Sequence, residues 1–296
     1  MADPAGISGQ RMGVVGAGTM GVGIVYVFAM AGFEVFLVEP DASGTKRALV
    51  TLRDAAANAV ARGKMTRDEC EAGLARVQTL KDADELPEGL DLVVETVPER
   101  RELKLAVLAT IAARAPGLIA TNTSAMSIED LSTAVTDHSR FLGMHFFNPV
   151  WSLKLVEIIR GAMTSDAAVA DAQAFASAIG KSSAVVSDTP GFATSRLDLV
   201  QALEAIRMVE QGVASPEDID RAVTTAYRHP VGPLRLSDMV GLDVRLDIAR
   251  QLESRLGAHF APPRLLQDMV ARGELGQKSG KGFYDWSAEN TFSKAG

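Results

Sequence analysis

Residues 12–39 constrain the fold of this chain more than any other stretch. An apolar run at 12–15 leads directly into the sequence GAGTMG at 16–21, and an apolar stretch of helical character follows to about residue 31. Gly32 interrupts that stretch, and a β-rich run at 34–38 ends at Glu39. A strand, a glycine turn, a helix, a strand and an acid in this order are the layout of a dinucleotide-binding unit.

Each part of the glycine turn has a chemical reason. Gly16 permits the tight turn, Gly18 lets the backbone approach a pyrophosphate, and Gly21 lets the helix pack against the preceding strand. Thr19 and Met20 open the helix, where unpaired N–H groups and a partial positive charge favour phosphates. We therefore predict that these five residues bind the cofactor.

The acid that ends the second strand indicates which nucleotide binds. Glu39 lies 18 residues beyond Gly21, about where a carboxylate should bind the ribose hydroxyls. A carboxylate at that place also repels the 2′-phosphate of NADP. The sequence therefore predicts NAD as the cofactor.

The pattern of apolar residues changes at about residue 188. Before it, β-rich runs alternate with helical stretches, which predicts an α/β fold with a parallel, doubly wound, Rossmann-like sheet. After it, apolar residues recur at intervals of three and four, which predicts an all-α C-terminal domain. We expect a disordered tail at 1–10, an NAD-binding domain at 11–188 and a helical domain at 189–296 for substrate binding and dimerisation. The runs are strands at 76–80, 91–95, 118–120, 140–145, 153–159 and 182–188, and helices at 42–62, 99–114, 192–211, 216–226, 236–256 and 263–271.

Composition excludes several classes of function. A net charge of −7 and a pI near 5.2 argue against a general nucleic-acid-binding protein. No uncharged apolar run reaches the length of a membrane span, and no Cys/His cluster or HExxH spacing suggests a metal. The single cysteine, Cys70, cannot form an internal disulfide, and the carboxylates around it predict an unreactive thiol. We expect a cytoplasmic protein.

Small hydroxyl residues follow the strand at 118–120. The sequence TNTSA at 121–125 lies at the carboxyl end of that strand, where ligands of open α/β sheets bind. Ser124 is therefore a candidate ligand contact. The alternative is a helix cap, provided by Ser124 or Ser127 before the helical sequence IEDL.

A histidine and a glutamate in neighbouring apolar strands form the candidate catalytic pair. His145 ends a strand among apolar residues, where a histidine is often only a satisfied core residue. Glu157 lies within the apolar run LVEII, and a carboxylate in such a run needs a partner. Together they supply a general base and the group that fixes its tautomer and stabilises the imidazolium.

These features occur together in one family. The chain resembles the short-chain L-3-hydroxyacyl-CoA dehydrogenases, which include the 3-hydroxybutyryl-CoA dehydrogenases. The resemblance covers nearly the whole chain in the family's order, and the stretch HFFNPV with NTS upstream and PGF downstream is highly specific. The matching pieces are GAGTMG at 16–21, VVETVPE at 93–99, NTSAMSI at 122–128, GMHFFNPV at 143–150, LVEII at 155–159, DTPGF at 188–192, HPVGPLRLSDMVGLD at 229–243 and GQKSGKGFYDW at 276–286.

The resemblance implies a role for each matching position. His145 is the base that takes the 3-hydroxyl proton while the C3 hydride passes to the nicotinamide, Glu157 is its partner, and Ser124 hydrogen-bonds the substrate. Without the resemblance, the residues near 99–104 read as a solvated helix start and those near 278 as a solvated turn. The positions that match NAD contacts are Glu99, Lys104, Asn148 and Lys278.

One position departs from the family pattern. The family usually has an asparagine after PGF-x-x, and this chain has Ser195 there. A serine still donates a hydrogen bond to the substrate but has a shorter reach and lacks the paired donor and acceptor of an amide. We expect activity with altered substrate positioning. The alternative is that Ser195 is only a residue at the N-terminus of a helix and has no role in substrate binding.

Two further sites are predicted in the same way, each with an alternative. Arg53, Arg62 and Lys64 are candidates for the phosphates of coenzyme A, although a solvated helical face explains them equally well. The apolar face at 197–209 is either a homodimer interface, which the family has, or part of the core of the helical domain.

Three functions remain in competition. The first is an NAD-dependent dehydrogenase that interconverts 3-hydroxyacyl-CoA and 3-oxoacyl-CoA. A CoA thioester that reacts far better than the free acid would distinguish it from the second. The second is a dehydrogenase of a free hydroxy acid or hydroxy-amine, of the gulonate or carnitine type, which has the same fold but needs no CoA site. The third is a non-catalytic NAD-binding protein, against which the complete set of Ser124, His145 and Glu157 argues.

Overall fold

The computed structural model describes residues 10–287, so the expected tail at 1–10 lies outside the described residues except for Gln10. The chain divides into two compact units, with the boundary between Phe192 and Ala193. We call the N-terminal part unit 1 and the C-terminal part unit 2, and we describe each by itself.

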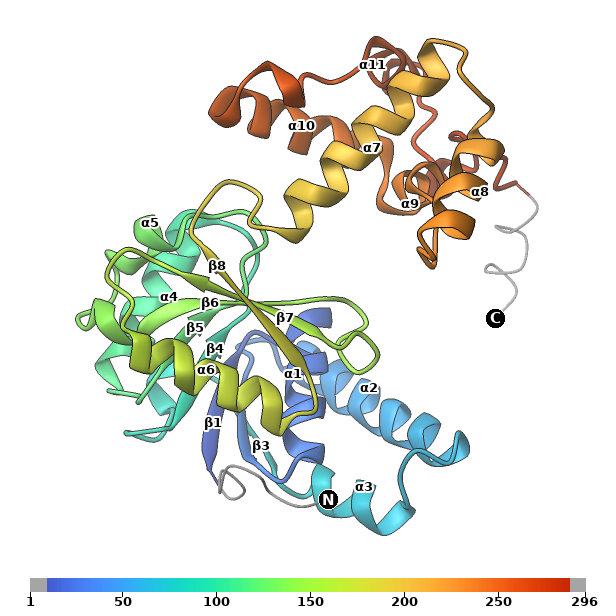
Figure 1. Ribbon diagram of the computed structural model, residues 1–296. Coiled ribbons are helices and arrows are strands. Elements are labelled where there is room, and N and C mark those ends of the chain that lie inside the picture. Colours follow the sequence, from blue (N-terminus) through green and yellow to red (C-terminus); the bar gives the residue numbers. More distant parts are fainter. Residues whose placement is uncertain (1–9, 288–296) are drawn as a thin grey trace. The chain divides into compact units, whose positions relative to one another are not determined.

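Unit 1 combines one sheet with helices (Figure 1). Its strands are β1 (Arg11–Val15), β2 (Glu34–Val38), β3 (Val77–Leu80), β4 (Leu92–Glu95), β5 (Ile119–Thr121), β6 (Phe141–Phe146), β7 (Leu155–Arg160) and β8 (Ser182–Ser187). Its α-helices are α1 (Thr19–Met30), α2 (Ala42–Ala61), α3 (Arg67–Leu74), α4 (Arg101–Ala113), α5 (Ile128–Ser132) and α6 (Asp166–Ala178).

The sheet has the strand order β3-β2-β1-β4-β5-β6-β7-β8. The first six strands are parallel to one another and follow the doubly wound order, so the predicted fold class is confirmed. The pair β6 and β7 is antiparallel, whereas β7 and β8 are parallel. The expectation of a wholly parallel sheet is therefore wrong at one pair, because the connection at 147–154 is too short for a crossover.

Alternate residues of the central strands face two different cores. Val14 of β1 packs in a core with α1, α2 and α6, whereas the next residue, Val15, packs in a core with α4 and α5. The same alternation continues on β2, where Leu37 belongs to the first core and Val38 to the second. This period of two places helices on both faces of the sheet and leaves its carboxyl edge to carry polar side chains.

Unit 2 is helical, as predicted, and has its own core. It contains α7 (Thr194–Glu210), α8 (Pro216–Ala226), α9 (Pro233–Val240), α10 (Leu242–Leu256) and α11 (Arg264–Ala271). The single helix predicted at 236–256 is in fact two, since Gly241 adopts a φ of 105° that a continuing helix does not permit.

The apolar face at 197–209 serves mainly the core of unit 2. Leu199, Leu203 and Ile206 are completely buried there, whereas Leu197 is 67% exposed.

No helix within residues 10–287 is long and apolar enough to cross a membrane.

Candidate active site

The glycine turn after β1 has the form of a nucleotide cradle. Gly16 has a φ of 108°, which a side chain would rarely tolerate. A Cβ on Gly21 would lie 1.9 Å from the carbonyl oxygen of Gly16, whereas a Cβ on Gly18 would meet nothing within 4 Å. The turn therefore packs tightly on its inner side and is open at Gly18, where a pyrophosphate needs room. The residues fit NAD.

Glu39 is held at the edge of this turn. Its Oε2 accepts a hydrogen bond from the Ala17 amide at 3.1 Å, and its Oε1 accepts one from the Asp41 amide, also at 3.1 Å. A Cβ on Gly44 would come within 3.0 Å of the Glu39 side chain, so the start of α2 also packs against it. The carboxylate thus has a fixed position next to the turn, as ribose recognition requires.

His145 and Glu157 lie directly opposite each other on the antiparallel strands β6 and β7. Nδ1 of His145 is 2.9 Å from Oε2 of Glu157, and both side chains are buried. Because a carboxylate only accepts hydrogen bonds, this contact assigns the proton to Nδ1 and the lone pair to Nε2. The pair therefore has the form of a general base with its orienting partner.

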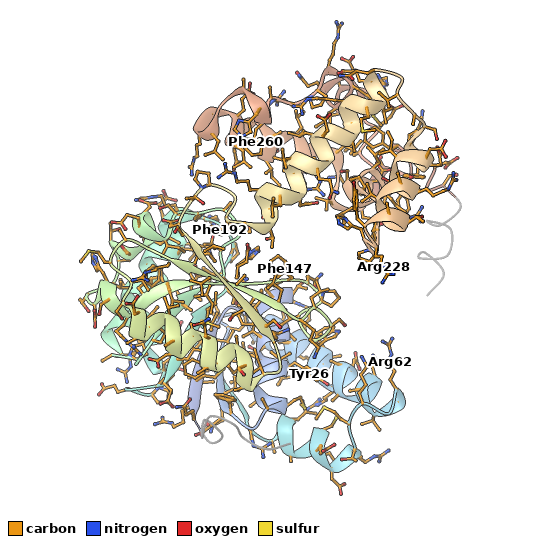
Figure 2. All side chains as sticks on the ribbon, in the orientation of Figure 1. Tyr26, Arg62, Phe147, Phe192, Arg228 and Phe260 are labelled. Atoms are coloured by element: carbon orange, nitrogen blue, oxygen red, sulfur yellow. The ribbon has the colours of Figure 1, made fainter. Side chains whose placement is uncertain are left out.

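Two aromatic rings surround the histidine. The ring centres of Phe147 and Phe192 lie 4.5 Å and 6.1 Å from that of His145. Figure 2 labels both phenylalanines. Phe147 follows β6 directly, and Phe192 is the last residue of unit 1. Apolar rings beside the imidazole exclude water and strengthen its electrostatic contact with Glu157.

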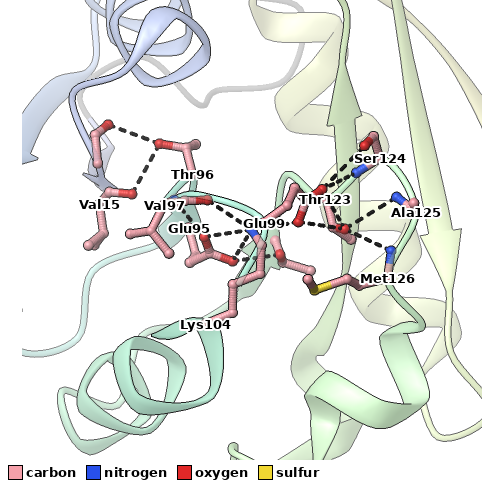
Figure 3. A network of polar contacts seen from close by, with 12 residues as sticks. Val15, Glu95, Thr96, Val97, Glu99, Lys104, Thr123, Ser124, Ala125 and Met126 are labelled. Carbon is pink, nitrogen blue, oxygen red and sulfur yellow. Dashed lines mark hydrogen bonds and ion pairs between the residues drawn. The ribbon is translucent and has the colours of Figure 1, made fainter. Parts of the chain in front are cut away.

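A second buried pair lies below the sheet edge, between β4 and α4 (Figure 3). The Nζ of Lys104 is 2.9 Å and 3.1 Å from the two carboxylate oxygens of Glu95. The Glu95 carboxylate is completely buried, and the Lys104 side chain is 1% exposed. Burial raises the pKa of Glu95, and the Lys104 ammonium opposes that rise. The interpretation of residues 99–104 as a solvated helix start is therefore wrong for Lys104.

Glu99 connects this pair to the loop at 122–127, between β5 and α5, which we call the serine loop after Ser124. Its Oε2 lies 3.4 Å from the Lys104 Nζ, and its Oε1 accepts hydrogen bonds from the Ser124 amide at 2.8 Å and the Ser124 hydroxyl at 3.3 Å. Ser127, not Ser124, caps α5, since its hydroxyl accepts from the Asp130 amide. Ser124 is exposed, which leaves its hydroxyl accessible to a ligand.

The loop at 147–154, between β6 and β7, is held in place by contacts on two sides. A Cβ on Gly23 of α1 would lie 2.7 Å from Val150, so the helix and the loop are in close contact. On the other side, the buried Nζ of Lys181 donates to the carbonyl oxygens of Val150 and Leu153 at 2.5 Å and 2.6 Å. Asn148, a predicted NAD contact, lies in this loop and is exposed.

The remaining predicted residues lie apart from this group along the chain. Ser195 is partly buried in the first turn of α7, and Lys278 pairs with Asp243, both within unit 2. Arg53, Arg62 and Lys64 are exposed on α2 and just beyond its end, with Arg62 labelled in Figure 2. Since Arg53 and Arg62 are about two and a half turns apart, they leave α2 on opposite sides.

Sequence reasoning missed two buried groups, Glu95 and Lys181. Glu95 ends the apolar run LVVE, so the rule that an acid in an apolar strand needs a partner applied to it as well as to Glu157. Nothing near Lys181 in the sequence signalled its burial, because its partners are distant backbone carbonyls.

Within residues 10–287 no three His, Cys, Asp or Glu side chains gather in a way that could hold a metal ion.

Two family models match successive parts of the chain. Residues 11–189 match the model described as "3-hydroxyacyl-CoA dehydrogenase, NAD binding domain", and residues 191–286 match "3-hydroxyacyl-CoA dehydrogenase, C-terminal domain". Together the two matches cover almost all the described residues.

Individual relatives agree with the family models. The 3-hydroxybutyryl-CoA dehydrogenase of Mycobacterium tuberculosis is 41% identical over 286 residues, which cover 94% of this chain and 98% of that protein. The 3-hydroxyadipyl-CoA dehydrogenase of Escherichia coli is 37% identical over 96% of this chain and 60% of its own length. The crystal structure of (S)-3-hydroxybutyryl-CoA dehydrogenase from Ralstonia eutropha matches with a TM-score of 0.89 at 36% identity, over 94% of this chain and 99% of that one.

Proposed function

The chain belongs to the 3-hydroxyacyl-CoA dehydrogenase family and is an NAD-dependent oxidoreductase, and we propose that it interconverts short-chain (S)-3-hydroxyacyl-CoA and 3-oxoacyl-CoA with His145 and Glu157 as its acid/base pair. The observation that carries the proposal is the buried 2.9 Å contact between these two side chains, made across the register of β6 and β7.

The arrangement accounts for proton transfer in both directions. In the oxidative direction Nε2 of His145 takes the proton of the 3-hydroxyl, and the Glu157 carboxylate stabilises the resulting imidazolium. NAD supplies the acceptor for the C3 hydride. The electron pair left on the substrate oxygen completes the carbonyl, and in the reductive direction the imidazolium returns the proton to that oxygen. Ser124 donates a hydrogen bond to the same oxygen and holds it near His145.

The nucleotide is held by the residues of the turn and the acid beyond it. The N–H groups at the start of α1, opened by Thr19 and Met20, bind the pyrophosphate, and Glu39 binds the ribose hydroxyls. Glu99 and Asn148 lie in the loops that follow β4 and β6 and complete the site, and the buried Lys104 contributes its charge through Glu99, 3.4 Å from its ammonium.

We assign the substrate contacts beyond the reacting carbon to three groups. Ser195 takes the place of the family asparagine and holds the substrate by a single hydroxyl. Arg62 and Lys64, exposed at the end of α2, bind phosphates of coenzyme A, and Arg53 supports them more weakly from the opposite side of the helix. The salt dependence of KM for the thioester measures how much these basic side chains contribute to the binding of coenzyme A.

The first experiment follows NADH absorbance with acetoacetyl-CoA, with free acetoacetate and NADPH as parallel controls. Rapid NADH consumption with the thioester alone supports the proposal, whereas turnover of free acetoacetate would favour the hydroxy-acid alternative. If neither substrate reacts, Ser195→Asn is tested next. Recovered activity then means a shifted substrate, and continued inactivity together with NADH binding means a protein without this catalysis.

We further propose a cytoplasmic homodimer assembled through unit 2. The single, buried cysteine supports a reducing compartment. Three exposed apolar side chains of unit 2, Leu197, Val240 and Val244, support a contact with a second copy. Sedimentation should show a dimer that Leu197→Glu weakens, and a wild-type monomer at micromolar concentration would refute the assembly.

A further inference from the structure

Two fully enclosed charges lie below the active site and take no direct part in the proton transfer described above. Glu95 ends β4, which is flanked by β1 and β5 in the middle of the sheet, and Lys104 reaches it from α4. Charges are costly to bury unless they are paired and hydrogen-bonded. A hydrophobic pair would pack the same space, so the charges need a further reason.

The Glu95 carboxylate is saturated with donors. It accepts from the Val97 amide at 2.6 Å, from the Thr121 hydroxyl at 2.7 Å, and from Lys104 at 2.9 Å and 3.1 Å. A carboxylate offers about four acceptor directions, and all are occupied here. Glu95 is therefore immobile, and it fixes the ammonium of Lys104.

Hydrogen bonds and ion pairs continue from Lys104 to the serine loop. Its ammonium donates to the Val97 carbonyl at 3.2 Å and lies 3.4 Å from Glu99. Glu99 in turn accepts from Thr123 at 2.9 Å and from Ser124, as Figure 3 shows. Glu99 is the one partly exposed acid of the group, with a side chain 42% exposed.

We propose that Glu95 is a positioning residue: it holds Lys104 in place, Lys104 holds Glu99, and Glu99, which accepts from the Ser124 amide, fixes the position of Ser124 beside the substrate. The inference rests on the function proposed for Ser124 and Glu99. Without the charge of Glu95, the nearest remaining carboxylate for the Lys104 ammonium is Glu99. Lys104 then draws Glu99 away from the Ser124 amide, and Ser124 loses its fixed position.

The test compares Glu95→Gln with the wild type in two assays. Turnover of acetoacetyl-CoA reports on Ser124, and a fluorescence titration with NADH reports on Glu99 independently of turnover. We expect kcat to fall about tenfold to a hundredfold and the Kd of NADH to rise several-fold, as for a misplaced catalytic group. Asp130→Asn is the matched control, because it breaks the exposed pair between Arg101, at the start of α4, and Asp130 of the neighbouring α5. It should change either value by less than about twofold.

A double-variant cycle separates positioning from general stability. If Glu95 acts through Glu99, Glu95→Gln should add less than about threefold in a Glu99→Gln background, whereas a merely structural role gives effects that multiply. Multiplying effects, or a folded Glu95→Gln protein with unchanged kcat and Kd, would overturn the inference. Thr121→Val, which removes one donor from Glu95, is the milder variant if Glu95→Gln does not fold. An inactive wild type that binds NADH would refute the proposed function and leave the titration to decide on Glu95.

Discussion

Replacing Glu157 by glutamine tests the proposed acid/base pair with the least change in shape. In the Glu157→Gln variant the amide keeps an oxygen that accepts from Nδ1 of His145, so the ring keeps its tautomer and orientation. What disappears is the negative charge opposite the imidazole. The variant therefore isolates the electrostatic contribution of Glu157 from its role in orientation.

The expected loss follows from the geometry. Unit charges about 4 Å apart attract by about 4 kcal/mol at the effective dielectric of about 20 that describes protein sites. Since a charge-assisted hydrogen bond exceeds a neutral one by about 1–2 kcal/mol, the two bounds give a loss of about 1–4 kcal/mol. Each 1.36 kcal/mol changes a rate about tenfold, so kcat should fall about fivefold to a thousandfold.

The assay is steady-state turnover of acetoacetyl-CoA with NADH, together with NADH titration and thermal unfolding. The Kd of NADH should stay within about twofold, because β4, β5 and β6 separate Glu157 on β7 from β1, which leads into the glycine turn. Stability should stay equal or rise, since a buried charge is removed and the amide keeps the hydrogen bond with His145. Glu34→Gln, an exposed acid at the opposite edge of the sheet, serves as the control. A folded Glu157→Gln protein with a kcat within about threefold of the wild type would refute the role of the carboxylate.

Three further predictions concern the nucleotide site and its supporting loop. Gly21→Ala should weaken NADH binding more than about thirtyfold in a titration and lower stability by about 1–3 kcal/mol, because the new Cβ would lie 1.9 Å from the Gly16 carbonyl. Glu39→Ser should raise the ratio of kcat/KM for NADPH to that for NADH about tenfold to a hundredfold, and an unchanged ratio would contradict the role of the acid. Burial lowers the pKa of Lys181 from 10.5 to about 8, so the fold disfavours its charged form and the free energy of unfolding should rise between those pH values. The slope is at most about 1.4 kcal/mol per pH unit, and denaturant titrations should show that Lys181→Met loses it.

The nucleotide-binding half of the site was predictable because its signals are local. The glycines, the helix start and Glu39 lie within one short segment, and their spacing alone determines the turn. The alternation of strands and helices likewise predicted a doubly wound sheet, although it did not predict the order of the strands. For this reason the fold class and the cofactor could be predicted before any contact was known.

Features that depend on direction or on distant partners were harder to predict. The predicted runs at 140–145 and 153–159 left too few residues for a crossover, so the antiparallel pairing of β6 and β7 was implicit in the connection length. The helix break at Gly241 was not, since a glycine inside a helix costs only about 1 kcal/mol and does not by itself end it. Its φ of 105°, which separates α9 from α10, has no signature in the neighbouring residues.

The two buried acids show why residue type alone does not determine a role. Glu157 lies within an apolar strand and Glu95 ends one, and each has a nitrogen partner at 2.9 Å. The partner of Glu157 is an imidazole, which gains and loses a proton near neutral pH, so this contact strengthens when His145 becomes charged in the reaction. The partner of Glu95 is an ammonium, which forms an ion pair whenever Glu95 is ionised and gives a constant geometry instead of a changing charge. An acid beside a titrating base serves proton transfer, and an acid beside a fixed cation serves positioning.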